Sequence, residues 1–250
     1  MRYAACSLAL FLAAPAFAQA PDTAEAVVKK AIDAHGGADV LNKLKAGQSK
    51  LKGDMSVLGM DLEFTGSMVY QLPDKFRLDI NTDVMGQKLA IVQVANGSKL
   101  KNTVNGMATQ LGEAEQAELR QAAMMQEVTQ LTPLLDGKKY TVKLEKDADV
   151  DGKPAHVVLV TAKDFKDTRL FFDAKSGLLV KTERKGLAPS TGDPKEVTEE
   201  TLLSDYKKVD GVMAPMKIVV NHDGKKFMTM TVSDAKLMEK ADDKSFAVDD

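Results

Sequence analysis

The chain has 250 residues, 44% of them hydrophobic, which is enough to build a core without disulfides or metal clips. Its 34 Lys and Arg residues nearly balance 36 Asp and Glu residues, giving a net charge of −2. Such a balance provides no basic field that would attract nucleic acid or an anionic membrane surface. We therefore expect no nucleic-acid partner.

The N-terminus has the pattern of a secretory signal peptide. Arg2 supplies a positive charge, residues 8–14 form an apolar stretch too short to span a bilayer, and an Ala-Phe-Ala cleavage sequence occupies 16–18. An uncleaved anchor is the alternative, but Pro15 would break its helix. We expect cleavage after Ala18 and a periplasmic mature protein. The only cysteine lies within this segment, so the mature chain has no disulfide, thiol nucleophile or thiolate metal site.

After the signal, the sequence predicts two helices. Asp22 and Thr23 can cap the first, apolar residues recur at helical spacing after them, and Gly36 is suited to end it. A second, short helix is predicted over 40–44. His35 could serve as a ligand or a base, but its place in the last turn, beside the negative helix end, favours a capping role.

A series of strands follows, each with apolar residues at alternate positions. The predicted strands run through 51–57, 60–70, 76–80 and 89–92. Tight turns separate many of the strands, because Asn and Asp tolerate the left-handed backbone of such turns and Gly adopts it freely. The turn dipeptides lie at 96–97, 105–106, 136–137, 151–152, 176–177, 210–211 and 223–224.

The strand pattern is interrupted from 113 to about 130, where the sequence lacks Gly and Pro and is rich in good helix formers. An apolar stripe that includes Leu119 and Val128 predicts an amphipathic helix here. Strands resume at Tyr140 and continue to Met238. Within them, the segment 186–195 contains two prolines and two glycines and is expected to be a loop.

These elements predict an α+β fold in which a curled antiparallel sheet is covered by the N-terminal helix and by a central helical lid. We assign residues 19–250 to one domain. The chain has 13 Met and no Trp, and flexible methionines suit a surface that adapts to varied apolar partners. Any single Met is as well explained by filling a core gap. The methionines on or near apolar faces are Met55, Met60, Met68, Met124, Met125, Met213, Met228 and Met230.

Several segments resemble the LolA-like outer-membrane lipoprotein-sorting proteins. A strand, a Pro-containing turn and a second strand at 70–78 are similar to a segment of that family, and the hairpin at 94–100 resembles the one that follows it. The resemblance implies a half-open antiparallel β-barrel closed by helices over an apolar cavity. Further matching segments, mainly of turn residues, are 151–160, 172–179, 205–212, Pro215 and Phe246.

One position departs from the family pattern. The sorting chaperone carries an arginine immediately before the proline of the strand-turn segment, where it helps to couple lid closure to lipoprotein release. The matching residue here is Leu72, before Pro73. A leucine cannot make charge-assisted hydrogen bonds to backbone carbonyls. The resemblance therefore implies lipid-binding architecture more strongly than lipoprotein transport itself.

The strand faces and the resemblance together predict a ligand site for acyl chains of lipids or lipoproteins. Each methylene removed from water contributes about 0.8 kcal/mol, so a long chain can bind without specific polar contacts. Expected partners are such acyl chains and, transiently, membrane-bound donor or acceptor proteins, and no cofactor is expected. The residues expected to line the cavity are Met55, Leu62, Phe64, Met68, Tyr70, Phe76, Leu78, Ile80, Ile91, Met125, Met228 and Met230.

No catalytic constellation is recognised, and we expect a protein that is not an enzyme. The motifs of serine hydrolases, zinc proteases and phosphate-binding loops are absent, and the three histidines lie far apart in the sequence. The segment 147–152 imitates the first half of a calcium loop, but Val158 replaces the required bidentate Glu. A hairpin turn with solvated carboxylates is the better interpretation, and no metal site is predicted.

Two functions remain from the sequence. One is a carrier that shelters an apolar ligand, and the other is a non-catalytic interaction or sensor scaffold that uses the same sheet without bound lipid. An unfilled concave face would favour the first and a filled one the second.

Overall fold

The computed structural model describes residues 23–188 and 194–248, so the predicted signal peptide, its cleavage site and Asp22 lie outside the described residues. The described chain forms a 14-stranded sheet with the neighbour order β6-β5-β4-β3-β2-β1-β16-β15-β12-β11-β10-β9-β7, and β8 pairs with β9. The main strands are β1 (Ala46–Val57), β2 (Met60–Gln71), β3 (Lys75–Val84), β4 (Gln87–Asn96), β5 (Lys99–Val104), β6 (Met107–Ala108), β7 (Tyr140–Leu144), β8 (Ala148–Val150), β9 (Lys153–Ala162), β10 (Phe165–Asp173), β11 (Leu179–Ala188), β12 (Lys195–Ser204), β15 (Lys217–His222) and β16 (Lys225–Met238). A separate pair is formed by β13 (Lys207–Val209) and β14 (Val212–Ala214).

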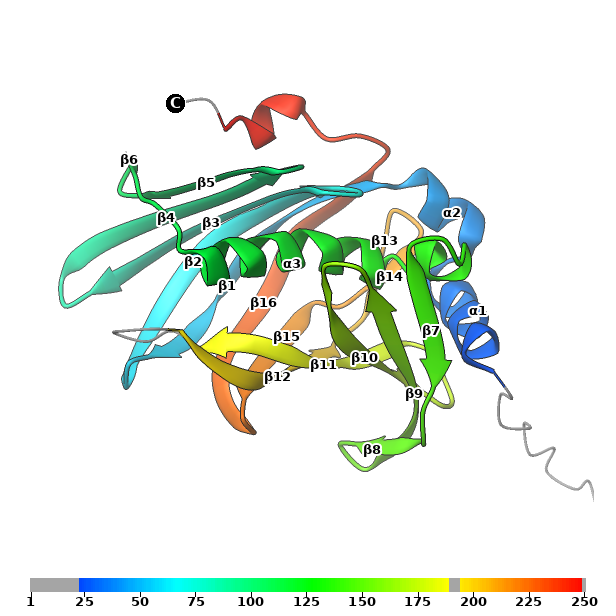
Figure 1. Ribbon diagram of the computed structural model, residues 1–250. Helices are drawn as coiled ribbons and strands as arrows, with labels where there is room; N and C mark the ends of the chain where they lie inside the picture. Colours follow the sequence, from blue (N-terminus) through cyan, green and yellow to red (C-terminus); the bar gives the residue numbers. More distant parts are fainter. Residues whose placement is uncertain (1–22, 189–193, 249–250) are drawn as a thin grey trace, which may run out of the picture.

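The sheet is antiparallel and curled but not closed. Its end strands, β6 and β7, are not neighbours, so the barrel remains open. Figure 1 shows the sheet bending around the central helix α3 (Glu113–Thr129), with α1 (Ala24–His35) and α2 (Ala38–Lys43) at one end. The predicted α+β class, with a curled sheet, an N-terminal helix and a central lid, is confirmed.

The first helix has the predicted caps. The Thr23 hydroxyl accepts a hydrogen bond from the Ala26 N–H at 3.2 Å, and Gly36 ends the helix with φ 130°. His35 Nδ1 donates to the Ala31 carbonyl at 2.7 Å, which confirms its capping role. Burial lowers the pKa of His35 below its usual value of 6.5, so the ring is neutral at pH 7.

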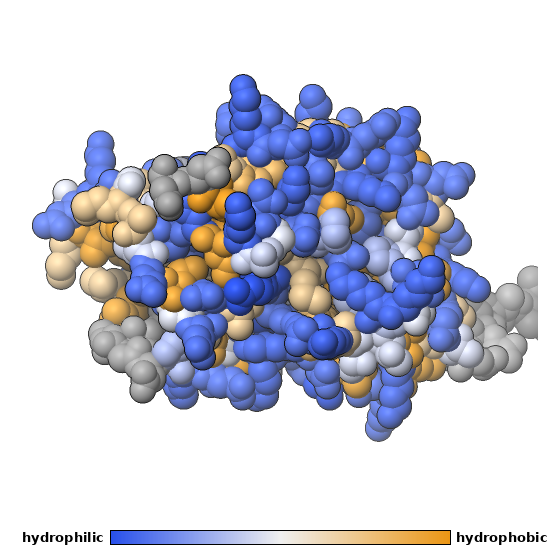
Figure 2. All heavy atoms as spheres, turned by 45° about the horizontal axis from the view of Figure 1, so that its top comes forward, coloured by the Kyte–Doolittle hydropathy of each residue, from blue (hydrophilic) through white to orange (hydrophobic). Residues whose placement is uncertain are grey.

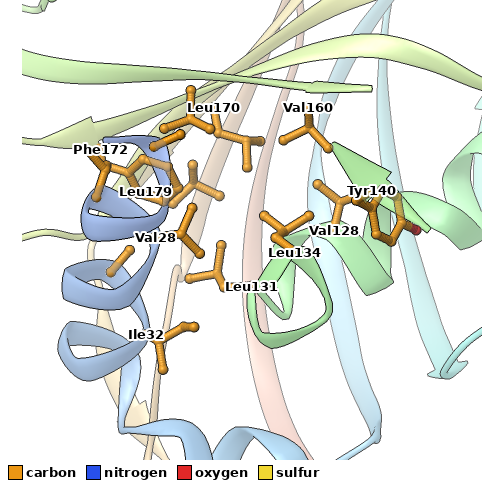
Figure 3. Packing of buried hydrophobic residues seen from close by; sticks show 14 of the residues in the cluster. Val28, Ile32, Val128, Leu131, Leu134, Tyr140, Val160, Leu170, Phe172 and Leu179 are labelled. Carbon is orange, nitrogen blue, oxygen red and sulfur yellow. The ribbon is translucent and has the colours of Figure 1, made fainter. Parts of the chain in front are cut away.

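The main core fills the end of the sheet that the helices cover. Side chains of α1, of the end of α3 and of the short helix η1 (Thr132–Leu135) meet those of β7, β9 and β10 (Figure 3). Val28, Leu131 and Leu170 are each 0% exposed. Here the concave face is occupied by the protein itself, as in an ordinary packed core.

The C-terminal segment packs on the opposite, convex face. The helix η2 (Asp243–Phe246) follows β16 and places Phe246, which is 0% exposed, against Ala46, Val94 and Ala241. The Asn96 side-chain amide donates to the Phe246 carbonyl at 3.1 Å. This contact leaves the concave face of the same strands to α3.

The seven predicted turn dipeptides each have a Gly of positive φ, but the left-handed backbone includes the preceding residue in only four of them. At 105–106, 151–152, 210–211 and 223–224 an Asn or Asp with φ between 48° and 51° precedes a Gly of positive φ. The loop predicted at 186–195 is shorter, because β11 continues to Ala188 and β12 begins at Lys195. Gly186 lies within a strand, where it pairs with Val197. Local composition alone therefore predicts a loop that begins before the end of β11.

Candidate apolar ligand site

Strand register places the predicted site residues of the sheet on one face. Residues directly opposite each other in an antiparallel pair share a face, and along each strand alternate residues do so. Met55 lies opposite both Leu62 and Met228, Tyr70 lies opposite Phe76, and Ile80 lies opposite Ile91. Phe64, Met68, Leu78 and Met230 fall on this face by the same alternation. It is the face that α3 covers (Figure 1).

Part of this face is filled by the lid. Leu119 and Ala123 of α3, each 4% exposed, pack against Phe76 and Ala95. Half-buried Met68, Tyr70 and Leu78 surround this contact. Burial raises the pKa of Tyr70 to about 12. These predicted site residues therefore hold the lid in the present conformation, and a ligand would reach them only by displacing α3.

A second part of the face carries apolar side chains that keep contact with solvent. They extend over five neighbouring strands, β4, β3, β2, β1 and β16, and Val220 of β15 joins them because it lies opposite Met228. All but Phe64, which is 2% exposed, are half-buried. We call this set the apolar wall, and its members are Met55, Leu62, Phe64, Ile80, Ile91, Val220, Met228 and Met230.

The wall differs from the core in its packing. None of its residues belongs to the clusters of tightly packed buried residues. Half-buried apolar side chains inside a curled sheet leave part of their surface for a further apolar partner. Met125, also predicted to line the cavity, instead packs partly against the main core. The structure therefore brings the strand residues together and places Met125 apart from them.

Charged residues lie on the far side of α3 from Phe76. Arg184 of β11 donates to Glu118 of α3 and forms an ion pair with Glu199 of β12, each at 2.8 Å. Lys166 of β10 also binds Glu118, and His222 Nε2 lies 3.4 Å from Glu199. We call these five residues the polar anchor.

An amide of the lid adds to the anchor. The Gln121 side chain donates to the Asp164 carbonyl at 2.8 Å and accepts from the Lys166 N–H at 3.1 Å. The lid is therefore held on one side by apolar contacts to β3 and β4, and on the other by hydrogen bonds and ion pairs to β10, β11 and the β9–β10 turn. Sequence reasoning missed the polar anchor. It left no local signal, because its members are ordinary charged residues that lie far apart in the sequence.

The anchor makes part of the stability depend on pH. Burial would raise the pKa of Glu199, but the hydrogen bond from His222 and the charge of Arg184 lower it below its usual 4.5. A lowered folded-state pKa contributes stability above pH 4.5 that is lost as pH falls through the folded value. We expect the urea midpoint to decrease from pH 6 to pH 3, and the decrease to be smaller in Glu199→Gln. An identical pH profile in wild type and variant would contradict this assignment.

A cleft of about 620 Å³ lies where α2, the end of α3 and the β2–β3 turn meet. Leu72 lines it together with Leu135 and Gln130, so this side chain lies near the end of the lid. The Gln130 amide instead ties this end to α2, donating to the Leu44 carbonyl at 3.0 Å and to that of Leu41. The lid end is thus fixed without an arginine.

The other polar motifs have local structural roles. Asp149 accepts the Gly152 N–H at 2.7 Å within the β8–β9 hairpin, which confirms the turn interpretation of the calcium-like segment. His156 pairs with Asp147 at 3.0 Å, whereas His35 and His222 have other partners. Within residues 23–188 and 194–248, no helix has the length and hydrophobicity needed to cross a membrane.

Comparison with known proteins identifies the fold. Neither a protein-family model nor a curated protein sequence matches the chain. A LolA superfamily protein from Nitrosomonas europaea superposes with a TM-score of 0.58 at 13% identity, over 91% of this chain and 98% of that one. A DUF1329 family protein from Desulfovibrio piger gives 0.53 at 13% identity, over 91% and 98% of the two chains. A domain assigned to the outer membrane lipoprotein-sorting proteins, from Vibrio parahaemolyticus, gives 0.51 at 10% identity, over 88% and 94%. The chain therefore has the fold of the LolA superfamily, as its turn motifs predicted.

Proposed function

We propose that this protein is a periplasmic carrier that shelters acyl chains of a lipid or lipoprotein between the apolar wall and α3. The observation that carries the proposal is the wall itself, a set of half-buried apolar side chains on the concave face and outside the packed core. A concave apolar surface that is still partly exposed suits a flexible hydrocarbon chain.

The energy available is sufficient for reversible binding. Burying sixteen methylenes contributes about 13 kcal/mol, at about 0.8 kcal/mol each. If association costs about 6 kcal/mol, the remaining ~7 kcal/mol corresponds to a dissociation constant on the order of ten micromolar. Methionines at three positions of the wall allow it to adapt to chains of different shape.

The proposal assigns no catalytic residue. The polar groups beside the wall belong to the anchor, in which Glu118 and Glu199 are already paired with Arg184. Leu72 supports a carrier of acyl chains in general over one built for the lipoprotein-release mechanism of the sorting chaperone, because no charged side chain at that position can engage the lid. The likeness to lipoprotein-sorting domains supports the same class of cargo.

Two neighbouring valines of β15 provide a matched test of the wall. Val220 faces the wall, whereas Val219 is half-buried on the opposite face. We expect Val220→Asp to weaken binding of a fluorescent fatty acid at least about tenfold, because a carboxylate must lose its water when the chain binds. Val219→Asp is expected to change the affinity less than about threefold.

Circular dichroism would establish that both variants are folded before the titration. Equal loss in both would indicate general damage to the sheet, and full binding by folded Val220→Asp would contradict the assignment of the wall. Native mass spectrometry of gently purified protein addresses the cargo directly. Near-stoichiometric copurified lipid is the expected result. A chain that neither copurifies with lipid nor binds the fatty acid would instead fit the scaffold alternative.

A further inference from the structure

Three large hydrophobic side chains are unusually exposed, and all three occupy tips of hairpins. In the described residues they are Leu58 at 55%, Met85 at 91% and Met107 at 70% exposure. They belong to the β1–β2, β3–β4 and β5–β6 hairpins, respectively. Since consecutive strands alternate in direction, these three turns lie at the same end of the sheet (Figure 1). We call these residues the apolar tips.

Figure 2 shows hydrophobic side chains at the surface on the side of the molecule where, in Figure 1, the β3–β4 and β5–β6 hairpins lie. This rim is opposite the end that α1 and α2 cover. The wall begins close behind it, because Leu62 follows the β1–β2 turn by three residues and lies on the concave face. The apolar tips therefore lie at the end of the sheet where the wall begins.

Turn chemistry does not explain two of the tips. Leu58 and Met85 have φ angles of 52° and 54°, and each precedes a glycine of positive φ. Four other two-residue turns of this kind in the chain have Asn105, Asp151, Asp210 or Asp223 at the same position. Leu and Met avoid the left-handed backbone, which Asn and Asp tolerate. Both residues therefore have a strained backbone, and packing of their side chains does not offset the strain because these side chains are exposed to solvent.

The arrangement fits a lipid surface better than a protein surface. A protein interface needs a contiguous, fully desolvated centre, whereas the apolar tips stand on separate hairpins with polar residues such as Asp83 and Gln87 between them. A fluid bilayer can surround separate apolar anchors individually.

Charges on the rim are compatible with phosphate head groups. Lys88, Lys225 and Lys226 are exposed at the strand ends of the same rim. The nearby carboxylates have structural roles, since Asp83 accepts the Gly86 N–H at 2.6 Å and Asp223 accepts the Thr198 N–H at 2.9 Å. The charges of the rim roughly cancel, and the net charge of the chain is −2, so attraction at a distance is weak and insertion of the tips must carry binding.

We propose that this rim docks on a phospholipid bilayer, with Leu58, Met85 and Met107 inserted at the boundary between head groups and acyl chains. The proposal goes beyond carriage of a ligand and does not depend on it, because docking uses the hairpin tips and not the wall. It would bring the end of the sheet where the wall begins to the membrane, which shortens the path of an acyl chain between bilayer and wall.

The test uses the mature chain and vesicles of phosphatidylcholine, alone or mixed with phosphatidylglycerol, in a flotation assay. We expect wild type to float with both, and half-molar salt to leave binding to neutral vesicles unchanged. The variant L58N/M85N/M107N should bind at least about tenfold more weakly. Fatty-acid binding by the free protein should remain as in wild type, which separates a failure of docking from a failure of the carrier function.

The melting temperature provides a second measurement, because the same substitutions should raise stability while they weaken docking. Leu58→Asn and Met85→Asn place a residue that tolerates the left-handed backbone, so each should raise Tm by roughly 2–4 °C while it weakens docking. Asp151→Met at the β8–β9 turn is the control, and should lower Tm without increasing flotation. Three results would each overturn the proposal: wild type floats with neither kind of vesicle, the triple variant floats as well as wild type, or the apolar tips cause self-association without any binding to vesicles.

Discussion

Replacing Glu118 by lysine is expected to detach α3 from β10 and β11. The substitution removes the acceptor shared by Arg184 and Lys166 and places a third positive charge beside them. All three side chains are at most 30% exposed, so water screens the repulsion only partly. We expect the free energy of unfolding to decrease by about 2–4 kcal/mol.

The loss of stability caused by Glu118→Lys should be greatest in α3. Amide hydrogen exchange of α3 should increase more than that of the main core, because the helix would lose its ion pairs to β10 and β11 and keep only its apolar contacts and the hydrogen bonds of Gln121 and Gln130. Glu113→Lys is the matched control, since Glu113 lies on the same helix and is exposed. Unchanged exchange in Glu118→Lys would show that the polar anchor does not hold the lid.

Replacing Gly53 by alanine is expected to separate β1 from β16. A Cβ at this position would lie 1.9 Å from the Thr229 carbonyl oxygen, and backbone atoms cannot move aside as a flexible side chain can. The sheet would have to open where Met230 lies opposite Gly53 and contributes to the apolar wall. We expect a loss of about 3 kcal/mol, at the upper end of the usual cost of overpacking.

The unfolding midpoint in urea would measure this loss. Gly112→Ala is the control, because its Cβ would make only an ordinary contact of 3.6 Å with Glu115, and it is expected to cost less than about 1 kcal/mol. Similar urea midpoints for Gly53→Ala and Gly112→Ala would show that β1 and β16 do not approach too closely at Gly53 to accept a Cβ. Gly66 on β2 presents the same geometry, with a Cβ position 2.1 Å from the Asp79 carbonyl.

Much of the fold could be predicted because its signals are local. Alternating apolar residues identify β2 and β3, and an uninterrupted run of helix formers identifies α3. Strand alternation also predicts that Met55 and Phe64 lie on the apolar faces of their own strands, and the register shows that these faces are the same one. The predicted one-domain boundary and the signal cleavage remain predictions, since the relevant N-terminal residues lie outside the described chain.

The rest depends on contacts between distant residues or on broken local rules. Glu118 and Arg184 are 66 positions apart, and the residues next to each of them do not predict that the two form an ion pair. Met85 was not recognised as a turn residue because methionine disfavours the backbone that it adopts. Such violations of local preference are expected at functional sites, which agrees with the proposed role of the apolar tips in docking on a bilayer.

The central claim is that an acyl chain contacts the apolar wall, and methionine-methyl NMR tests it most directly. The mature chain, labelled at its methionine methyl groups, would be titrated with a fatty acid below its micelle concentration. We expect shifts at Met55, Met228 and Met230, which belong to the wall, and none at Met213, which lies on β14. Saturable shifts confined to the wall are the predicted result. Saturable shifts at Met213 without any at the three wall methionines, or no shifts at all, would contradict the account.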